Sequence, residues 1–309
     1  MNTPLFSVII PAYNYAHTLS RAVDSVLAQS SDDMELFVIN DGSTDNTPEI
    51  IDQLRHKHPD SIQVIDQENR GLAATRNRGV DESQGTFLIF LDADDELTEN
   101  ALDSLRQAIN DNPSVEMIIG AHISVQADGQ KKQRTREPLP DNTEKKFRYY
   151  LLEEKLSIAN GATAMHRKIF QNYRYPEHFR CVEDISMFSY VLANYECITL
   201  NKPIAYIHKH DDSMRNNIEL ELSVGLSLVD EIFSPDRLPN ELLIYRSQYE
   251  TMRYLGIFRT LYLSGDYRQA LSFYAKAIKK TPTALLRASF LRKAIRATIH
   301  SCFRSRATA

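Results

Sequence analysis

Short apolar runs and longer amphipathic stretches alternate along the first part of the chain. The apolar runs have the length of strands and occupy residues 5–10, 36–39, 62–65 and 87–91. The stretches between these runs have apolar residues at helical spacing or at positions compatible with a helix, and they occupy residues 18–28, 50–54 and 71–80. This repeated strand–helix order predicts a parallel sheet with right-handed crossovers. Ligands of such sheets bind beyond the carboxyl ends of the strands, so we expect functional residues there.

The fourth apolar run is followed directly by acidic residues. Residues 87–91 are all apolar, which predicts a strand buried on both faces, and Asp92, Asp94 and Asp95 come next. Three carboxylates at one strand end repel each other unless a cation neutralises them, which favours a site for a hard divalent ion. Alternatively, the acids begin a helix that is capped at Thr98. That alternative accounts for Asp95 better than for Asp92.

The ends of the other strands also carry chemically useful side chains. Tyr13 follows the first strand, Asp41 follows the second, and Arg70, Arg76 and Arg78 lie between the third and the fourth. This set of side chains suits a nucleoside diphosphate. The ring can stack on the base, the carboxylate can accept a hydrogen bond from the base, and the guanidinium groups with a metal can hold the phosphates. Taken singly, each has a structural alternative: a packed loop, a turn, or a solvated helix face.

The alternation fades after Ala108. We expect further strands at residues 117–125, 198–200 and 204–207, and a helix at residues 182–192. This helix begins with Glu183 and Asp184, and acids in a first turn commonly complement the helix dipole. The last strand leads into a segment with His208 and His210 beside acids, which are candidate metal ligands. Residues 125–180, where we expect substrate specificity to be decided, show no readable pattern.

Composition places the chain among ordinary globular proteins. It has 309 residues and a net charge of −5, and we expect no nucleic-acid partner. No apolar run is long enough to span a bilayer, and the N-terminus lacks the pattern of a signal peptide. Three isolated cysteines without metal-ligand spacing suit a reducing compartment: Cys181, Cys197 and Cys302. We therefore expect a cytoplasmic protein.

The C-terminal region has a different charge balance. After Asp266 the chain holds ten basic residues and no acid. Apolar residues recur at helical spacing between Thr283 and Phe303, which predicts a basic amphipathic helix. Such a helix either docks on the acidic body of the protein or binds an anionic membrane at its cytoplasmic face. Before it, residues 265–282 have the spacing of one helix of a tetratricopeptide repeat, which predicts a helical hairpin.

Six segments together resemble the family-2 inverting glycosyltransferases, which have the GT-A nucleotide-sugar-binding fold. They occur in the order of that family and cover about two thirds of the chain: residues 7–14, 38–45, 71–79, 90–95, 183–184 and 206–213. The resemblance implies an α/β GT-A domain with a mostly parallel, doubly wound sheet over residues 1–220, and a helical region over residues 221–309. It further implies transfer of a hexosyl or acetylhexosaminyl group, from a UDP-type donor, to a glycan or lipid-linked glycan acceptor in cell-surface polysaccharide synthesis.

The resemblance also implies roles for individual residues. Pro11, Tyr13, Asp41, Arg70 and Arg76 would bind the nucleotide. In the Asp-X-Asp motif, Asp92 would contact the ribose, while Asp94, with His210 near the phosphates, would hold Mn²⁺ or Mg²⁺. Asp184 would be the catalytic base, with Glu183 beside it.

Three other functions are compatible with parts of the pattern. A dinucleotide-dependent oxidoreductase needs Gly-x-Gly-x-x-Gly after the first strand, and residues 11–16 lack it. A sugar nucleotidyltransferase has a related sheet but usually an early glycine-rich basic loop, which is absent. A non-catalytic binding or scaffold protein with a repeat-like tail is the third alternative.

Overall fold

The computed structural model describes residues 3–29, 33–209 and 218–307. It divides into two compact units, Met1–Lys146 with Leu156–Asp212 and Phe147–Lys155 with Ser213–Ala309. The boundary expected at residue 220 falls close to this division, which also groups residues 147–155 with the C-terminal segment. Each unit is described separately below.

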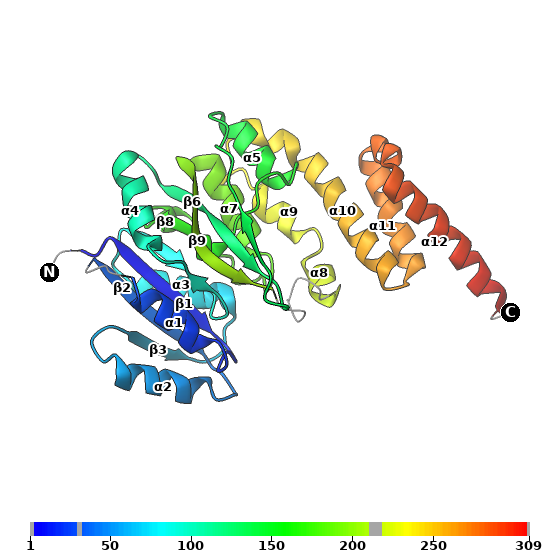
Figure 1. Cartoon of the computed structure of the whole chain (residues 1–309). Helices are drawn as coiled ribbons and strands as arrows, with labels where there is room; N and C mark the ends of the chain where they lie inside the picture. Colours follow the sequence, from blue (N-terminus) through cyan, green and yellow to red (C-terminus); the bar gives the residue numbers. More distant parts are fainter. Residues whose placement is uncertain (1–2, 30–32, 210–217, 308–309) are drawn as a thin grey trace. The chain divides into compact units, whose positions relative to one another are not determined.

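The first unit begins with the predicted strand–helix repeats (Figure 1). Its first four strands are β1 (Phe6–Ala12), β2 (Met34–Asp41), β3 (Gln63–Gln67) and β4 (Phe87–Phe90). They alternate with helices α1 (Leu19–Leu27), α2 (Thr47–Lys57) and α3 (Leu72–Glu82). The strands pair in parallel in the order β3-β2-β1-β4, which confirms the predicted topology of this part.

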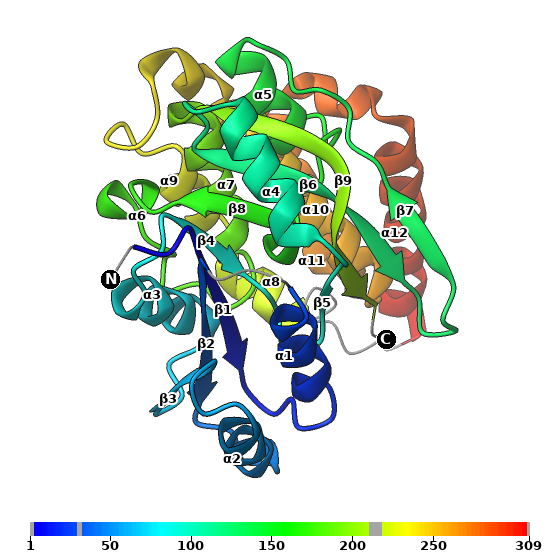
Figure 2. The ribbon, with the colours of Figure 1, turned by 60° about the vertical axis from the view of Figure 1, so that its left-hand side comes forward.

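Beyond β4 the sheet becomes mixed. The remaining strands are β5 (Glu96–Leu97), β6 (Met117–Val125), β7 (Lys131–Arg134), β8 (Thr163–His166) and β9 (Cys197–His208). They extend the nine-stranded sheet in the order β4-β8-β6-β9-β5, with β7 paired to β6 (Figure 2). Among the described strands of this part, only the β6–β9 pair is parallel. Helices α4 (Ala101–Asp111), α5 (Thr143–Leu151), α6 (Ile169–Asn172) and α7 (Glu183–Asn194) connect these strands. The sheet is therefore less parallel than the sequence pattern predicted.

One local expectation and one alternative differ from the structure. Residues 198–200 and 204–207 belong to one strand, β9, which pairs with β6 across register shifts on either side of Ala121. The acids after β4 do not begin a helix capped at Thr98. Thr98 instead donates its hydroxyl to the Pro203 carbonyl, and helix α4 begins only at Ala101.

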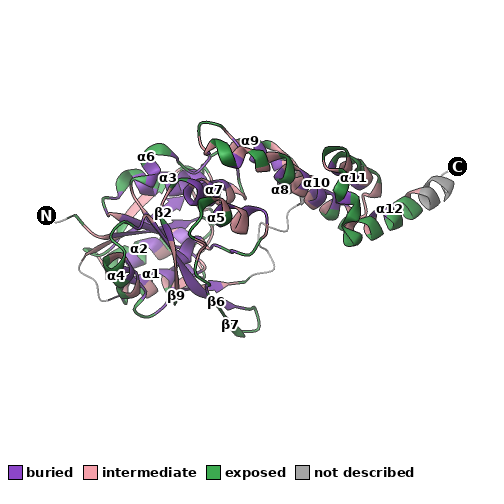
Figure 3. Ribbon diagram, turned by 90° about the horizontal axis from the view of Figure 1, so that it is seen from above, coloured by how far each residue is buried: buried purple, intermediate pink, exposed green. Residues whose placement is uncertain are grey.

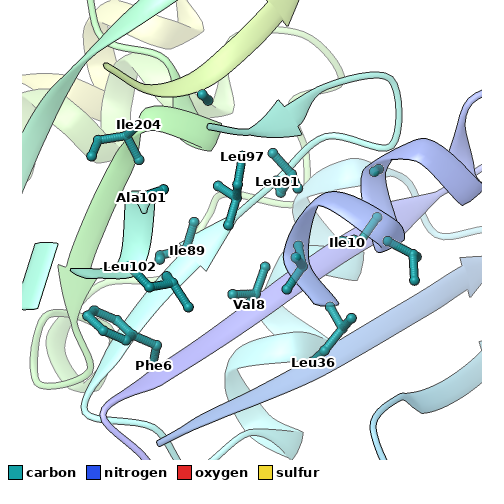
Figure 4. Close-up of a cluster of buried hydrophobic side chains, with 14 of the residues drawn as sticks. Phe6, Val8, Ile10, Leu36, Ile89, Leu91, Leu97, Ala101, Leu102 and Ile204 are labelled. Atoms are coloured by element: carbon teal, nitrogen blue, oxygen red, sulfur yellow. The ribbon is translucent and has the colours of Figure 1, made fainter. Parts of the chain in front are cut away.

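Helices cover both faces of the parallel strands. Phe6, Val8 and Ile10 of β1 belong to one buried cluster with apolar residues of α1, α2 and α4 (Figure 4). Ile9 faces the opposite side, where α3 packs so closely that a Cβ added at Gly79 would lie 2.5 Å from the Ile9 Cγ2. This alternation is the expected consequence of period-two side-chain direction in a strand. The core thus fixes β1 and β4 in the middle of the sheet, with their carboxyl ends side by side.

The second unit is helical. Its elements are α8 (Ile218–Val224), α9 (Ser227–Ile232), η3 (Asn240–Tyr245), α10 (Arg246–Leu263), α11 (Tyr267–Lys280), η4 (Pro282–Leu286) and α12 (Ala288–Ala307). The predicted hairpin is formed by α10 and α11, which join at Gly265 with a φ of 83° and at Asp266, whose carboxylate accepts from the Gln269 amide. Leu255 and Phe258 of α10 pack with Ala270, Tyr274 and Ala294 in the core of this unit. None of the helices in the described ranges is long and apolar enough to cross a membrane.

Candidate active site

A cluster of carboxylates lies just beyond the carboxyl end of β4. The Asp95 amide donates to the Asp92 carbonyl at 3.0 Å, so the segment turns tightly and brings its acids together. Asp95 is 4 % exposed, whereas the Asp92 side chain is 39 % exposed. Burial, together with the negative charges of Asp92 and Asp94, raises the pKa of Asp95 well above its usual value. The cluster therefore combines one buried acid, Asp95, with the partly exposed carboxylate of Asp92.

The donor chemistry of this cluster fits a divalent cation that is shared with a substrate. Within the part of the chain that the structure describes, no group of three or more His, Cys, Asp or Glu side chains forms a complete metal site. Mg²⁺ usually needs only one or two protein carboxylates beside waters and substrate phosphates, and carboxylates equally suit Mn²⁺. Asp92 and Asp94 are both partly exposed. His210, the other predicted ligand, lies outside the described residues.

Beneath the acids, Arg76 connects three segments of the chain. Its Nη2 donates to the Asp92 Oδ1 at 2.9 Å, and its Nη1 donates to the Glu183 Oε1 at 2.8 Å. The side chain is 2 % exposed and its Cζ lies 5.3 Å from the centre of the Tyr175 ring. Although burial opposes its charge, the two carboxylates raise the pKa of Arg76, so the guanidinium stays protonated. The structure places Arg76 below the site surface.

The two acids at the start of α7 lie in different environments. Glu183 is 3 % exposed and pairs with Arg76, while Asp184 is only partly buried. Burial raises the pKa of Glu183, and the Arg76 charge opposes that shift. Of the two, only Asp184 has a side chain with access to solvent, and therefore to a substrate.

Asp41 organises the loop that precedes α3. Its Oδ1 accepts from the Gln67 side chain at 2.7 Å and from the Arg70 amide at 2.9 Å, and its Oδ2 accepts from the Gly71 amide at 2.9 Å. The side chain is 3 % exposed, and Gly71 has a φ of 89° that suits glycine. Asp41 thus fixes the loop, while its predicted contact with a base stays a prediction.

The segment after β1 presents Tyr13 to solvent. Tyr13 is 44 % exposed, and the following residue, Asn14, has a φ of 62°. The Asn14 side chain accepts from the Thr44 amide at 2.8 Å, and its own backbone amide donates to the Ser43 hydroxyl, so the loops after β1 and β2 are joined. An exposed aromatic ring on a braced loop can stack on a base. Pro11 is buried inside β1, and its predicted contact with the nucleotide stays a prediction.

Arg70 lies at the edge of the site. Its side chain is 61 % exposed and its Nη2 lies 3.1 Å from the Glu177 Oε2. An exposed ion pair of this kind is weak, so the guanidinium can change partner at little cost. The predicted contact of Arg70 with the nucleotide remains sterically open.

The structure adds a polar network that the sequence pattern did not reveal. Arg21 of α1 donates to the Asp94 carbonyl at 2.7 Å and lies 3.1 Å from the Glu96 carboxylate. Glu96 also contacts the His208 Nε2 at 2.8 Å, and the His208 amide donates to Asp95 at 2.8 Å. The pairing of β5 with β9 brings His208 to Glu96 and Asp95, residues far apart from it in sequence. No local signal could have found them.

Comparison with known proteins decides the family. Residues 7–174, more than half of the chain, match the model described as glycosyl transferase family 2. The chain belongs to this family. The resemblance inferred from the six sequence segments is thereby confirmed.

Curated relatives of this glycosyltransferase match it over part of their length. An uncharacterized glycosyltransferase of Nostoc sp. is 49 % identical over 89 residues, which cover 29 % of the chain and 28 % of the relative. The minor teichoic acid biosynthesis protein GgaA of Bacillus subtilis is 36 % identical over 120 residues, covering 37 % and 27 %. The chondroitin synthase of Pasteurella multocida is 35 % identical over 126 residues, covering 41 % and 13 %. The matched part therefore spans less than a third of each of these relatives.

Solved structures share the fold over nearly the whole chain. TarS 1–349 of S. aureus in complex with UDP-GlcNAc has a TM-score of 0.69 at 21 % identity, covering 97 % of this chain and 91 % of that one. The mannosyltransferase PcManGT of Pyrobaculum calidifontis, in complex with GDP-Man and Mn²⁺, has a TM-score of 0.58 at 18 % identity, covering 96 % and 81 %. The predicted fold class is confirmed: an α/β GT-A domain with a helical C-terminal region.

Proposed function

We propose that the chain is an inverting glycosyltransferase that moves a hexosyl or acetylhexosaminyl group from a UDP-linked donor to an acceptor hydroxyl. The observation that carries this proposal is that Asp92, at the end of β4, and Glu183, at the start of α7, form ion pairs with the same Arg76 guanidinium. Names of similar proteins support the donor and the pathway, since TarS 1–349 was solved with UDP-GlcNAc and GgaA is a teichoic acid biosynthesis protein. The expected acceptor is a glycan or lipid-linked glycan of a bacterial cell surface.

The donor would bind over the carboxyl ends of β1, β2 and β4. Tyr13 would stack on the base, with Asp41 and Arg70 beside it and Asp92 at the ribose. Asp94, with His210, would hold Mn²⁺ or Mg²⁺, which when bound stabilises negative charge on a diphosphate. Asp92 and Asp94 are partly exposed carboxylates, which suits a divalent cation that is shared with substrate phosphates.

Asp184 would act as the general base. It accepts the proton of the acceptor hydroxyl while that oxygen forms a bond to the anomeric carbon and the nucleoside diphosphate departs with the electrons of the broken bond. A single displacement of this kind inverts the configuration. Glu183, the neighbour of Asp184, was also expected in the catalytic site. It is buried against Arg76 and is better suited to hold α7 in place.

The test is release of UDP from a panel of UDP-sugars, supplied with Mn²⁺ and candidate cell-surface acceptors. Asp184→Asn should retain donor binding and lose turnover by orders of magnitude, whereas Asp94→Asn should weaken metal-dependent donor binding as well. Asp60→Asn is the matched control, because Asp60 is exposed and precedes β3 at the amino ends of the strands. Donor binding without any turnover across the panel would instead favour a non-catalytic binding protein.

We also propose that α12 attaches the enzyme to an anionic membrane, at the cytoplasmic face of the plasma membrane. Much of this helix is exposed (Figure 3). One face of it is apolar, with Leu291, Ile295 and Ile299 at 38 %, 52 % and 49 % exposure. The face that packs on the hairpin is a different one, marked by buried Ala294 and Ala297. The exposed stripe therefore has no role in the core of its own unit.

Charge supports a lipid partner for this stripe. Arg292 and Arg296 follow Leu291 and Ile295 by one residue, so they lie beside the stripe, about 100° around the helix. An apolar stripe bordered by basic residues, with no acid after Asp266, has the features of a helix that lies in a membrane interface.

Co-sedimentation with phosphatidylglycerol-containing vesicles tests this attachment. Binding should weaken at high salt and should be lost in Ile295→Glu. Ser289→Glu adds the same charge to an exposed position off the stripe, so it should lose far less binding. Equal loss in the two variants, or no binding of the intact chain at low salt, would refute the attachment. A dimer that dissociates in Ile295→Glu would instead assign the stripe to a second copy.

A further inference from the structure

One guanidinium joins the acidic cluster to the helix that carries Asp184. Arg76 comes from α3, Asp92 follows β4 and Glu183 opens α7, and the two ion pairs have donor–acceptor distances of 2.9 Å and 2.8 Å. Glu183 and Asp184 are neighbours in the first turn of α7, where the Ser186 hydroxyl also donates to the Glu183 carbonyl at 3.0 Å. A shift of Glu183 would therefore move the backbone of Asp184.

The surroundings of Arg76 fix its direction. Its Cζ lies against the Tyr175 ring, and the Tyr175 hydroxyl donates to the Asn160 side chain at 2.9 Å. Asn77, the neighbour of Arg76 on α3, accepts from the Tyr175 amide at 3.0 Å and donates to the Tyr175 carbonyl at 2.9 Å. The same helix thus supplies the guanidinium and holds the ring on which it rests.

We infer that Arg76 is a positioning residue, which holds Asp184 at a set place relative to Asp92 by acting through Glu183. This differs from the nucleotide contact that the sequence implied, because a side chain that is 2 % exposed and bound to two carboxylates has no open face toward a ligand. The inference rests on the proposed function, in which Asp184 receives the acceptor proton and Asp92 binds the donor. It deepens that proposal by naming the residue that aligns Asp184 with Asp92.

The geometry needs arginine. A guanidinium presents donors in a fixed planar fork and can bind two carboxylates at once, whereas an ammonium is a compact charge on a flexible stem. In Arg76→Lys the charge remains buried between Asp92 and Glu183, but the two-armed connection is lost. Misplacement of a reacting group by about 1 Å can lower a rate roughly a hundredfold.

Arg76→Lys should therefore lower kcat about a hundredfold while the donor Kd, measured by calorimetry, changes less than about threefold. Arg55→Lys is the matched control, since Arg55 is exposed in the last turn of α2 and has no predicted part in the site. It should leave both quantities unchanged. An Arg76→Lys variant with weakened donor binding and normal kcat at saturation would assign Arg76 to the nucleotide and overturn the inference.

A second pair of variants tests action through Glu183. Glu183→Gln keeps the shape of the side chain, removes its charge, and should lower kcat in the same direction. If Arg76 acts through Glu183, then Arg76→Lys should cost much less kcat in the Glu183→Gln background than in the wild type. Fully additive losses would overturn the inference.

Hydrogen exchange gives a readout that does not depend on activity. The amides of Ile185 and Ser186, in the first turns of α7, should exchange faster in Arg76→Lys than in the wild type and be unaffected in Arg55→Lys. Unchanged exchange in Arg76→Lys overturns the inference. If the wild type turns over no nucleotide-sugar, the proposed function fails, and the exchange measurement still decides whether Arg76 positions α7.

Discussion

Replacing Asp41 with Asn perturbs a buried side chain that accepts three hydrogen bonds. Its Oδ1 accepts from the Gln67 side chain and the Arg70 amide, and its Oδ2 accepts from the Gly71 amide. An asparagine has one oxygen and one amide group in the same places. Whichever way the new side chain turns, its NH₂ group faces at least one donor that the carboxylate accepted.

The cost follows from these contacts. In the better orientation the oxygen of the new side chain takes the place of Oδ1. Two acceptor bonds then remain, each weaker by about 1 kcal/mol because the acceptor loses its charge. The Gly71 amide loses its partner, which costs about 1–3 kcal/mol for a buried donor. Because the loop reaches solvent at Arg70, water relieves part of this loss. We expect the variant to be destabilised locally by about 2–4 kcal/mol.

The assay is hydrogen exchange at the amides of Arg70 and Gly71, read together with the urea midpoint of the donor-free protein. Because every 1.4 kcal/mol corresponds to a factor of ten, their exchange should accelerate between about 30-fold and 700-fold. Asp66→Asn is the matched control on the neighbouring strand. Asp66 is exposed and accepts from the Asn40 side chain at 2.8 Å, which an asparagine oxygen can still do.

The result that would refute the reasoning is an Asp41→Asn variant with the same exchange rates and urea midpoint as Asp66→Asn. Such a result would mean that the carboxylate does not hold the loop in the absence of donor. Its role would then be confined to the predicted contact with the base.

Three further predictions concern packing, pH and donor binding. Gly79→Ala should lower the free energy of unfolding by about 1 kcal/mol, because overpacking against Ile9 costs about 1–3 kcal/mol and the gain in helix propensity is about 1 kcal/mol. A variant that is more stable than the wild type in urea unfolding would contradict this. Burial and the nearby Arg136 charge lower the pKa of His122 to about 4, so the unfolded chain binds a proton below pH 6.5 that the folded chain does not. Stability should therefore fall as the pH drops from 6.5 to 4, and less steeply in His122→Gln, as thermal unfolding across that range would show. Tyr13→Ala should weaken donor binding at least about fivefold, because stacking on a base is worth about 1–3 kcal/mol, whereas Tyr13→Phe keeps the ring and should not weaken it. Equal donor affinities of Tyr13→Ala and the wild type by calorimetry would exclude the stacking role.

The local pattern determined the first half of the catalytic domain. Strand-length apolar runs and helical spacing predicted β1 to β4 and the helices between them, because periodicity in a parallel sheet is set by neighbouring residues along the chain. The same logic found the hairpin of α10 and α11, whose turn is marked by Gly265 and Asp266. It also placed Tyr13, Asp41 and Asp92 at strand ends, where the sheet topology brings them to one edge.

Tertiary structure decided what each of these residues contacts. Asp92 and Glu183 meet on Arg76 although they lie far apart in the sequence, and β5 pairs with β9 where a helix start was the alternative. Spacing within a segment cannot report such pairings, because they depend on how strands β5 to β9 order themselves in the sheet. The sequence could therefore name Arg76 as important, but only burial between two carboxylates shows that it supports the site from below. Local periodicity determines elements, and long-range packing determines which side chains remain free to bind a substrate.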